Sequence, residues 1–326
     1  MASPVEALIR DQLAERRDRL QGIAGQSPDA DRLRTLLREV DAALERLDRG
    51  TYGICETCHD PIEADRLMAD PLLEYCLDHL SPTEQRALEQ DLDLAARVMR
   101  GLLPPPSLSL PGYEIARHYE GPGPVGGDYC DALGAPDGSL HFAIGDVSGK
   151  GVAASMLMAH LHATLRALVP LGLPLEELVA RASRLFCESA LPSHFATLVC
   201  GRASRSGEVE LCNAGHVPPL VARQGAVEAI ASTGLPIGMF CDARFAVARL
   251  RLAPGDAILL YTDGVSETRG AADEEYGIER LKALLAQGPA RKPAETVSVC
   301  LRDLKAFRAG AAKSDDLTLM AIQRVE

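Results

Sequence analysis

Four short aspartate-containing segments limit the folds open to this 326-residue chain, because each lies at the end of an apolar, strand-like run. They are Gly126-Gly127-Asp128, Gly145-Asp146, Asp263-Gly264 and Asp315-Asp316. A carboxylate at a strand end sits on a rigid scaffold, and neighbouring glycines let the backbone approach a bound ion closely. Carboxylates that converge from several strands predict an oxygen-only site suited to Mg²⁺ or Mn²⁺.

From Gly112 onward the pattern predicts strands mixed with helices. The predicted strands are 113–119, 140–144, 196–202, 209–212, 245–252, 257–261 and 317–323, and the predicted helices are 151–169, 175–190, 277–286 and 294–308. Several strands follow one another with no helix between them. This favours an α+β fold with antiparallel sheets and helices packed outside over an alternating β-α fold.

The first fifty residues predict two helices, about 5–23 and 29–49, with an N-cap and a helix-starting proline at Ser27-Pro28-Asp29. Leucines and a valine recur in a 4-3-4-3 seam in the second helix, at Leu33, Leu37, Val40, Leu44 and Leu47. We favour a helical hairpin that buries its own seam. Pairing between chains is the alternative.

A third helix is predicted to begin at the capping box Ser81-Pro82-Thr83-Glu84 and to end before the prolines at 104–106. It carries one apolar stripe, at Leu88, Leu92, Ala95, Met99 and Leu102. We therefore predict three parts: residues 1–80, a linker helix at 81–103, and a catalytic domain at 104–326. We expect the linker helix to form a homodimer or to pack on the catalytic domain, and to pass a signal to it.

Two ligand pairs with zinc spacing lie between the helices: Cys55 with Cys58, and Cys76 with His79. Thiolates and imidazole suit Zn²⁺, and four protein ligands would make the site structural. His59, next to Cys58, is a rival ligand, and the spacing favours His79.

The stretch from Ala42 to Glu56, with Pro61-Ile62 and Arg66-Leu67 downstream, resembles the DksA/TraR zinc-finger family. The resemblance implies a coiled-coil hairpin joined to a finger with one structural zinc, in a family of which some members act on RNA polymerase. His79 stands where the commonest pattern has cysteine, and the tip at 25–31 lacks the family's acidic motif. The second difference argues against polymerase binding.

The chain from about 104 to 326 resembles the SpoIIE/RsbU branch of the PPM family of metal-dependent protein phosphatases. The matching motifs are Pro111-Gly112-Tyr113-Glu114-Ile115-Ala116, Val125-Gly126-Gly127-Asp128-Tyr129, the segment 145–151, Phe195-Ala196-Thr197-Leu198, Asn213-Ala214-Gly215-His216, Gly234-Leu235-Pro236-Ile237-Gly238, Tyr261-Thr262-Asp263-Gly264 and Ser314-Asp315-Asp316-Leu317-Thr318. The resemblance implies an αββα sandwich of two antiparallel sheets flanked by helices.

The same resemblance implies a two-metal site of Mn²⁺ or Mg²⁺. Asp146 would bridge the ions, Val147 would offer its carbonyl, Asp128 would lie at the edge, and Asp263 and Asp315 would bind the second ion. Asp316 is expected to close its own turn. A water shared by two cations is acidic enough to attack phosphorus in line.

Three neighbouring residues bear on the proton transfers. Ser148 stands where the family's eukaryotic branch has a general-acid histidine, so a metal-bound water is expected to protonate the leaving alkoxide. His216 is interpreted as structural, with a catalytic role as the alternative. Lys150 is either a phosphate or partner contact or a solvated loop lysine.

The formal net charge of −12 argues against general binding to nucleic acid or to an anionic membrane. The N-terminus has no signal-peptide pattern, and the apolar stretch 153–174 is interrupted by His160, His162 and Arg166, so we expect a buried helix. The nine cysteines suit a reducing cytoplasm. Six are interpreted as small core residues: Cys130, Cys187, Cys200, Cys212, Cys241 and Cys300.

These observations predict a cytosolic protein serine/threonine phosphatase. Its substrate, from the resemblance, is expected to be a phosphorylated STAS-type anti-sigma-factor antagonist. The alternative is an RNA-polymerase-binding or scaffold protein in which the phosphatase fold is not essential.

Overall fold

The computed structural model describes residues 9–10, 12–14, 17–18, 21, 30–80, 82–121, 123–149, 151–190, 194–287, 291–310, 313 and 315–326. The chain forms two compact units, Met1–Asp91 and Leu92–Glu326. The boundary falls inside helix α4 (Pro82–Leu102), so the linker helix belongs partly to each unit.

The first unit contains α2 (Ala30–Arg49), α3 (Ala64–Ala69) and the short 3-10 helix η1 (Leu77–His79). The described residues of the first predicted helix are helical, and two of them, Ile9 and Leu13, are buried with Val40 and Leu44 of α2 in one apolar cluster. This packing is what the intramolecular hairpin requires. The predicted cap at 27–29 lies outside the described residues.

The second unit is built from two antiparallel sheets, as the sequence predicted. One has the strand order β3-β4-β5-β6-β9, with bounds Asp128–Gly134, Leu140–Val147, Ala196–Ala203, Glu208–Ala214 and Ala248–Arg251. The other has the order β1-β2-β11-β10-β7-β8, with bounds Ser107–Leu110, Tyr113–Glu120, Leu317–Arg324, Ala257–Tyr261, Leu220–Arg223 and Ala226–Ala229.

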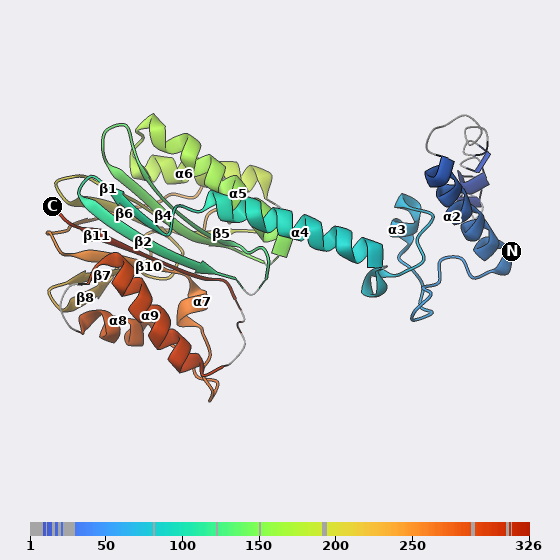
Figure 1. Ribbon diagram of the computed structural model, residues 1–326. Helices are drawn as coiled ribbons and strands as arrows, with labels where there is room; N and C mark the ends of the chain where they lie inside the picture. Colours follow the sequence, from blue (N-terminus) through green and yellow to red (C-terminus); the bar gives the residue numbers. More distant parts are fainter. Residues whose placement is uncertain are drawn as a thin grey trace. The chain divides into compact units, whose positions relative to one another are not determined.

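Helices cover the outer faces of this sandwich (Figure 1). They are α5 (Gly151–Leu168), η2 (Val169–Leu171) and α6 (Leu175–Ser189) on the five-stranded sheet, and α8 (Ile278–Ala286) and α9 (Pro293–Arg308) on the six-stranded sheet. A short helix, α7 (Asp263–Ser266), follows β10. The arrangement gives the four layers of an αββα sandwich.

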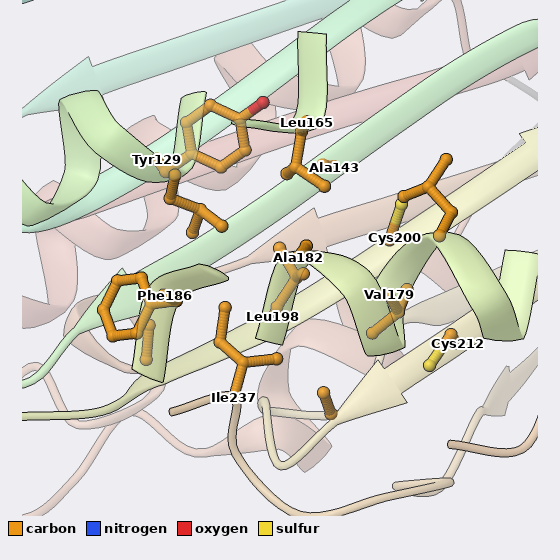
Figure 2. Close-up of a cluster of buried hydrophobic side chains, with 14 of the residues drawn as sticks. Tyr129, Ala143, Leu165, Val179, Ala182, Phe186, Leu198, Cys200, Cys212 and Ile237 are labelled. Carbon is orange, nitrogen blue, oxygen red and sulfur yellow. The ribbon is translucent and has the colours of Figure 1, made fainter. Parts of the chain in front are cut away.

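Alternation along the strands explains the layers, because successive side chains point to opposite faces of a sheet. In β4, Ala143 packs under α5 and α6, whereas Phe142 and Ile144 pack between the sheets. In β11, Met320 faces the other sheet and Leu319 faces the helices. Figure 2 shows the layer beneath α5 and α6.

Within the described part of the chain, one helix, Gly151–Leu171, is long and apolar enough to cross a membrane by length and composition. It packs on β3, β4 and α6, and buries Met158, Leu161 and Leu165 in the apolar cluster beneath it. It is therefore a core helix of the sandwich, as the interrupted hydropathy predicted.

Four strands were missed from the sequence: β1, β3, β7 and β8. Strand β3 (Asp-Tyr-Cys-Asp-Ala-Leu-Gly) contains two aspartates and a glycine, residues that are depleted in strands. Its place beside β4 at the edge of a buried sheet outweighs that local preference.

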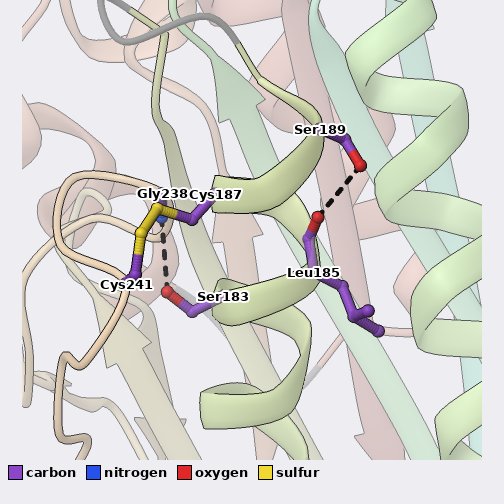
Figure 3. Close-up of a disulfide and its surroundings, with 6 residues drawn as sticks. All are labelled: Ser183, Leu185, Cys187, Ser189, Gly238 and Cys241. Atoms are coloured by element: carbon purple, nitrogen blue, oxygen red, sulfur yellow. Dashed lines mark hydrogen bonds between the residues drawn. A yellow bond between two sulfur atoms is a disulfide. The ribbon is translucent and has the colours of Figure 1, made fainter.

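Two of the six predicted core cysteines differ from the prediction. Cys130, Cys200, Cys212 and Cys300 are buried free thiols. Cys187 of α6 and the exposed Cys241 form a disulfide instead (Figure 3). The loop that carries Cys241 is also held to α6 by the Gly238 N–H, which donates to Ser183 Oγ at 3.3 Å.

Candidate metal centres

The four predicted zinc ligands come together in the first unit. The ligand atoms of Cys55, Cys58, Cys76 and His79 all lie within 4.8 Å of one another. The Sγ atoms of Cys58 and Cys76 are 3.7 Å apart, and Cys76 Sγ is 3.4 Å from His79 Nδ1. Two sulfurs bound tetrahedrally at about 2.3 Å from one zinc would be ~3.8 Å apart. The donors present therefore fit Zn²⁺.

Local backbone turns assemble this group. Cys55 N–H donates to Asp60 O, and His59 N–H donates back to Cys55 O, which forms a tight knuckle. His59 has a positive φ of 62° and an exposed side chain outside the group. The geometry thus agrees with the preference for His79.

The electrostatics of the knuckle favour a cation. Burial raises the pKa of the Cys55 thiol, but backbone donors from Cys58, Cys76 and Thr57 outweigh it and lower the pKa to about 6. The Asp60 backbone lowers the pKa of Cys58, but burial and the Cys55 and Cys76 sulfurs raise it to about 11. A second thiolate beside the first is costly unless a cation neutralises both.

Asp128 and Asp146 meet in the second unit, because they are directly opposed partners of the antiparallel β3–β4 pair. Gly127, just before Asp128, allows close contact with the end of β4. A Cβ at Gly127 would lie 2.8 Å from Val147 O and 3.4 Å from Asp146 Oδ1. The predicted ligand atoms of Asp146 and Val147 therefore face the start of β3.

Two threonines hold the Asp128 carboxylate. Its Oδ2 accepts hydrogen bonds from Thr262 Oγ1 at 2.8 Å and from Thr318 Oγ1 at 2.5 Å. Burial raises the pKa of Asp128 well above its usual range; the Thr318 hydrogen bond opposes this, and the charges of Asp146 and Asp316 add to it. Several carboxylates that raise one another's pKa in a buried place form a natural cation site.

Gly264 brings Asp263 next to the segment that carries Asp315. A Cβ at Gly264 would lie 1.8 Å from Asp316 O and 3.5 Å from Asp315 Cβ, so only glycine fits between α7 and this segment. Burial and the charges of Asp263, Glu275 and Asp315 raise the pKa of Glu267. Asp263 and Asp315 thus act electrostatically on one common neighbour.

Asp316 does more than the sequence predicted. Its buried carboxylate Oδ2 accepts the Gly127 N–H at 2.8 Å and the Asp128 N–H at 3.5 Å. It therefore joins the start of β11 to the start of β3, whereas closure of its own turn was expected. No feature of a single sequence distinguishes this role from that of Asp315.

The carboxylates are spread more widely than the zinc group. Among the described residues, the zinc group is the only set of three or more potential ligands whose donor atoms all lie within 4.8 Å of one another. Two hard ions about 4 Å apart that keep several waters need a wider array. The donor set and its spread are compatible with Mg²⁺ or Mn²⁺.

Ser148 and His216 have structural hydrogen bonds. Ser148 Oγ accepts the Phe195 N–H at 3.0 Å. His216 Nε2 is 3.0 Å from the carbonyl of Tyr261, so this nitrogen carries the proton, and Nδ1 accepts from Thr197 Oγ1 at 2.7 Å. Burial lowers the pKa of His216 to about 4. A neutral His216 joins β5 to β10, which agrees with its structural interpretation.

Sequence reasoning missed Thr262, Thr318 and His194. The threonines follow or precede the predicted aspartates, but only the tertiary contacts show that they hold Asp128. His194 Nε2 lies 3.9 Å from where a Cβ at Gly149 would be, beside the loop that follows β4. Lys150 lies outside the described residues.

Residues 136–325 match the family described as Stage II sporulation protein E (SpoIIE). Residues 50–78 match the prokaryotic dksA/traR C4-type zinc finger. The second match ends one residue before His79, and this chain offers three cysteines and one histidine in place of four cysteines.

Known proteins support both the sequence family and the fold. The phosphoserine phosphatase RsbP of Bacillus subtilis is 25% identical, over 70% of this chain and 56% of RsbP. The structure of the RsbU and RsbW domains of Rv1364c from Mycobacterium tuberculosis is 31% identical (TM-score 0.57; 68% of this chain, 62% of that one). The SiaA-PP2C domain of Pseudomonas aeruginosa shares the fold at 18% identity (TM-score 0.66; 76% of this chain, 100% of that one). The chain spans about half the length of the first curated relatives that it matches.

Proposed function

Because the chain belongs to the SpoIIE family of PPM-type phosphatases and carries a DksA/TraR-type zinc finger, we propose that it is a metal-dependent protein serine/threonine phosphatase. The observation that carries the proposal is the opposed pair Asp128 and Asp146, held by residues that adjoin Asp263 and Asp315. The proposed domains are residues 1–80, 81–103 and 104–326. The proposed location is the cytoplasm, where finger thiols stay reduced.

The proposed ligands of two Mn²⁺ or Mg²⁺ ions are Asp146 as the bridge, Val147 O, Asp128, Asp263 and Asp315. When bound, the ions would supply an activated water and neutralise charge on the phosphoryl oxygens. Thr262 and Thr318 fix one oxygen of Asp128, which orients its carboxylate. Ser148 Oγ accepts the Phe195 N–H and so fixes the end of β4. Its hydroxyl is too weak an acid to protonate the leaving alkoxide, so we assign that role to a water. The proposed ligands of one structural Zn²⁺ are Cys55, Cys58, Cys76 and His79.

The test is phosphate release by the full chain from p-nitrophenyl phosphate and from a phosphoserine protein in Mn²⁺. We expect Asp146→Asn to lower kcat/KM at least about 10³-fold, because it removes the proposed bridging charge. Asp242→Asn, at an exposed position, should match the wild type. Equal rates for the wild type and Asp146→Asn would refute the proposal.

The proposed substrate is a phosphorylated STAS-type anti-sigma-factor antagonist. The support is the family and the likeness to RsbP, whose name describes a phosphoserine phosphatase. The full chain should release phosphate from a phosphorylated STAS protein at least ten times faster, in kcat/KM, than from an unrelated phosphoserine protein. Equal values would remove the STAS assignment and leave the phosphatase assignment intact.

The proposed regulation passes from the zinc module through α4. Leu92 lines a cavity of about 420 Å³ with Val125, Val152 and Asp315, and Met99 packs against the apolar cluster beneath α5 and α6. Leu88, Leu94 and Val98 are exposed on the same helix, where a second copy could cover them. We expect Leu92→Glu with Met99→Glu to change activity or oligomeric mass. Arg97→Ala is the control, and an unchanged mass and rate in the double variant would contradict this route.

The second candidate function is docking on RNA polymerase, favoured by the finger match at 50–78. Most of the hairpin tip at 25–31 lies outside the described residues. Recovery of polymerase on the immobilised full chain, and its loss in a variant without residues 22–29, would support this function. Failure to recover polymerase would exclude it without affecting the phosphatase proposal.

A further inference from the structure

A cavity of about 240 Å³ is lined by residues of the six-stranded sheet and of helices α8 and α9, together with Arg291. These two helices cover that face of the sheet (Figure 1). This volume is roughly that of eight waters at ~30 Å³ each. None of the cavity's lining residues belongs to either metal centre.

The cavity exists because three neighbouring strands carry alanine where a larger side chain would fill the layer. Ala222 of β7 and Ala257 of β10 are direct register partners. Ala321 of β11 is the partner of Leu259. Two residues earlier on the same strands, and on the same face, Leu220 and Leu319 are buried under the helices. The alanines thus make an apolar floor.

The rim supplies more hydrogen-bond donors than it uses. Arg291 Nη1 donates to Leu284 O at 3.2 Å, and among the described residues no carboxylate forms an ion pair with Arg291. Arg223 has a buried Nε without a hydrogen-bond partner. The same guanidinium is already paired with two carboxylates, since its Nη1 donates to Glu228 Oε2 at 3.4 Å and its Nε lies 3.8 Å from Asp256 Oδ2. Arg291 is therefore the arginine of the rim with donors to spare.

Two other polar side chains of the rim, Thr296 and Gln323, are neutral and hydrogen-bonded. Thr296 Oγ1 donates to Lys292 O at 3.2 Å, and Gln323 Nε2 donates to Gly255 O at 3.2 Å. Arginine presents its donors in a planar fork that suits a carboxylate. The cavity therefore favours a ligand with a hydrogen-bond acceptor at one end, facing the rim, and an apolar group at the other end, over the alanines.

We propose that this cavity binds a small organic carboxylate, with its anionic end at Arg291 and its apolar body over Ala222, Ala257 and Ala321. The proposal is independent of phosphatase activity. Ligand pockets usually bury an apolar body and fix its orientation with a few polar groups, and this cavity has both parts at a small scale.

The probe is 4-fluorobenzoate, titrated into the full chain and followed by the broadening and shift of its fluorine NMR signal. Saturable binding is expected, and the neutral analogue 4-fluorobenzyl alcohol should bind at least ten times more weakly. Arg291→Gln should weaken 4-fluorobenzoate at least tenfold, and Ala257→Leu, which fills the floor, should abolish binding. Arg249→Gln, an exposed change on the other sheet, should bind as the wild type does.

No saturable binding by the wild type would overturn the proposal. Equal binding by Arg291→Gln would also overturn it, and because this residue lies at the rim, the result does not depend on whether Ala257→Leu folds. Unchanged affinity in a folded Ala257→Leu variant, checked by circular dichroism, would place the probe elsewhere and would equally refute the site.

Discussion

The zinc group and the aspartate centre assemble in opposite ways. The zinc ligands lie between Cys55 and His79, and two local turns bring them within 4.8 Å of one another. The aspartates lie between Asp128 and Asp315, on β3 and β4 of one sheet and beside β10 and β11 of the other, so a site that uses all of them needs both sheets. A site whose ligands are close in sequence depends on its ion for its shape. A site whose ligands are far apart in sequence depends on the fold around it.

Zinc removal should have the largest effect, and it should be confined to the first unit. A small finger draws about 10 kcal/mol or more of folding free energy from its metal. With a strong zinc chelator, or with Cys76→Ser, we expect residues 50–80 to lose hydrogen-exchange protection while the β-sandwich keeps it. His59→Ala is the matched control, since this residue lies outside the group. Equal hydrogen-exchange protection of residues 50–80 with and without the chelator would show that their fold does not depend on zinc.

Acid should weaken the second unit through His216. Its pKa is about 4 in the folded protein because burial disfavours the charged ring, so the unfolded chain takes up this proton first as the pH falls. The neutral His216 ring contributes fully to the free energy of unfolding above about pH 6.5, the usual pKa of histidine in an unfolded chain. This contribution, about 3 kcal/mol, is lost as the pH falls towards 4. Urea unfolding at pH 7 and pH 4.5 should show a smaller pH dependence for His216→Gln. His59→Gln should keep the wild-type dependence, and an identical slope in both variants would argue against a buried neutral His216.

Gly264→Ala should push Asp263 away from the segment that carries Asp315. The added Cβ would meet the Asp316 carbonyl at 1.8 Å, and backbone cannot move aside as a flexible side chain can. We expect a loss of about 2 kcal/mol in the free energy of unfolding and a fall of about 10²-fold in phosphatase kcat/KM. Gly101→Ala has no atom within 4 Å of its Cβ and should be neutral or slightly stabilising. Full activity in Gly264→Ala would mean that Asp263 and Asp315 need not be held together.

The smallest effect is expected at the surface of the hairpin. Arg10 Nη1 and Asp48 Oδ1 are 2.6 Å apart, and both side chains are exposed. Exposed pairs contribute little because water screens them, so Asp48→Asn should cost at most about 0.5 kcal/mol. Chemical denaturation of the zinc-loaded chain measures this value. A loss several times larger would show that the hairpin depends on this pair more than on its apolar seam.

The same contrast explains which features were predictable. Cys55, Cys58, Cys76 and His79 could be predicted because their spacing reflects a local turn. Helix α5 and strands β4, β5 and β10 could be predicted because their periodicity is strong. Strand β3 was missed because its local preference is poor, and the disulfide of Cys187 and Cys241 was missed because those residues are 54 positions apart.

By itself, the sequence determined the family resemblance, the helices and strands with a strong periodicity, and the aspartate segments, because these depend on side chains close in the chain. Only the tertiary structure decided that Asp128 opposes Asp146, that Asp316 holds the start of β3, that His216 joins the sheets, and that three alanines leave a cavity. Those features depend on the register between distant strands. That register is set by packing of the sheets against each other and against the helices, which no single segment encodes.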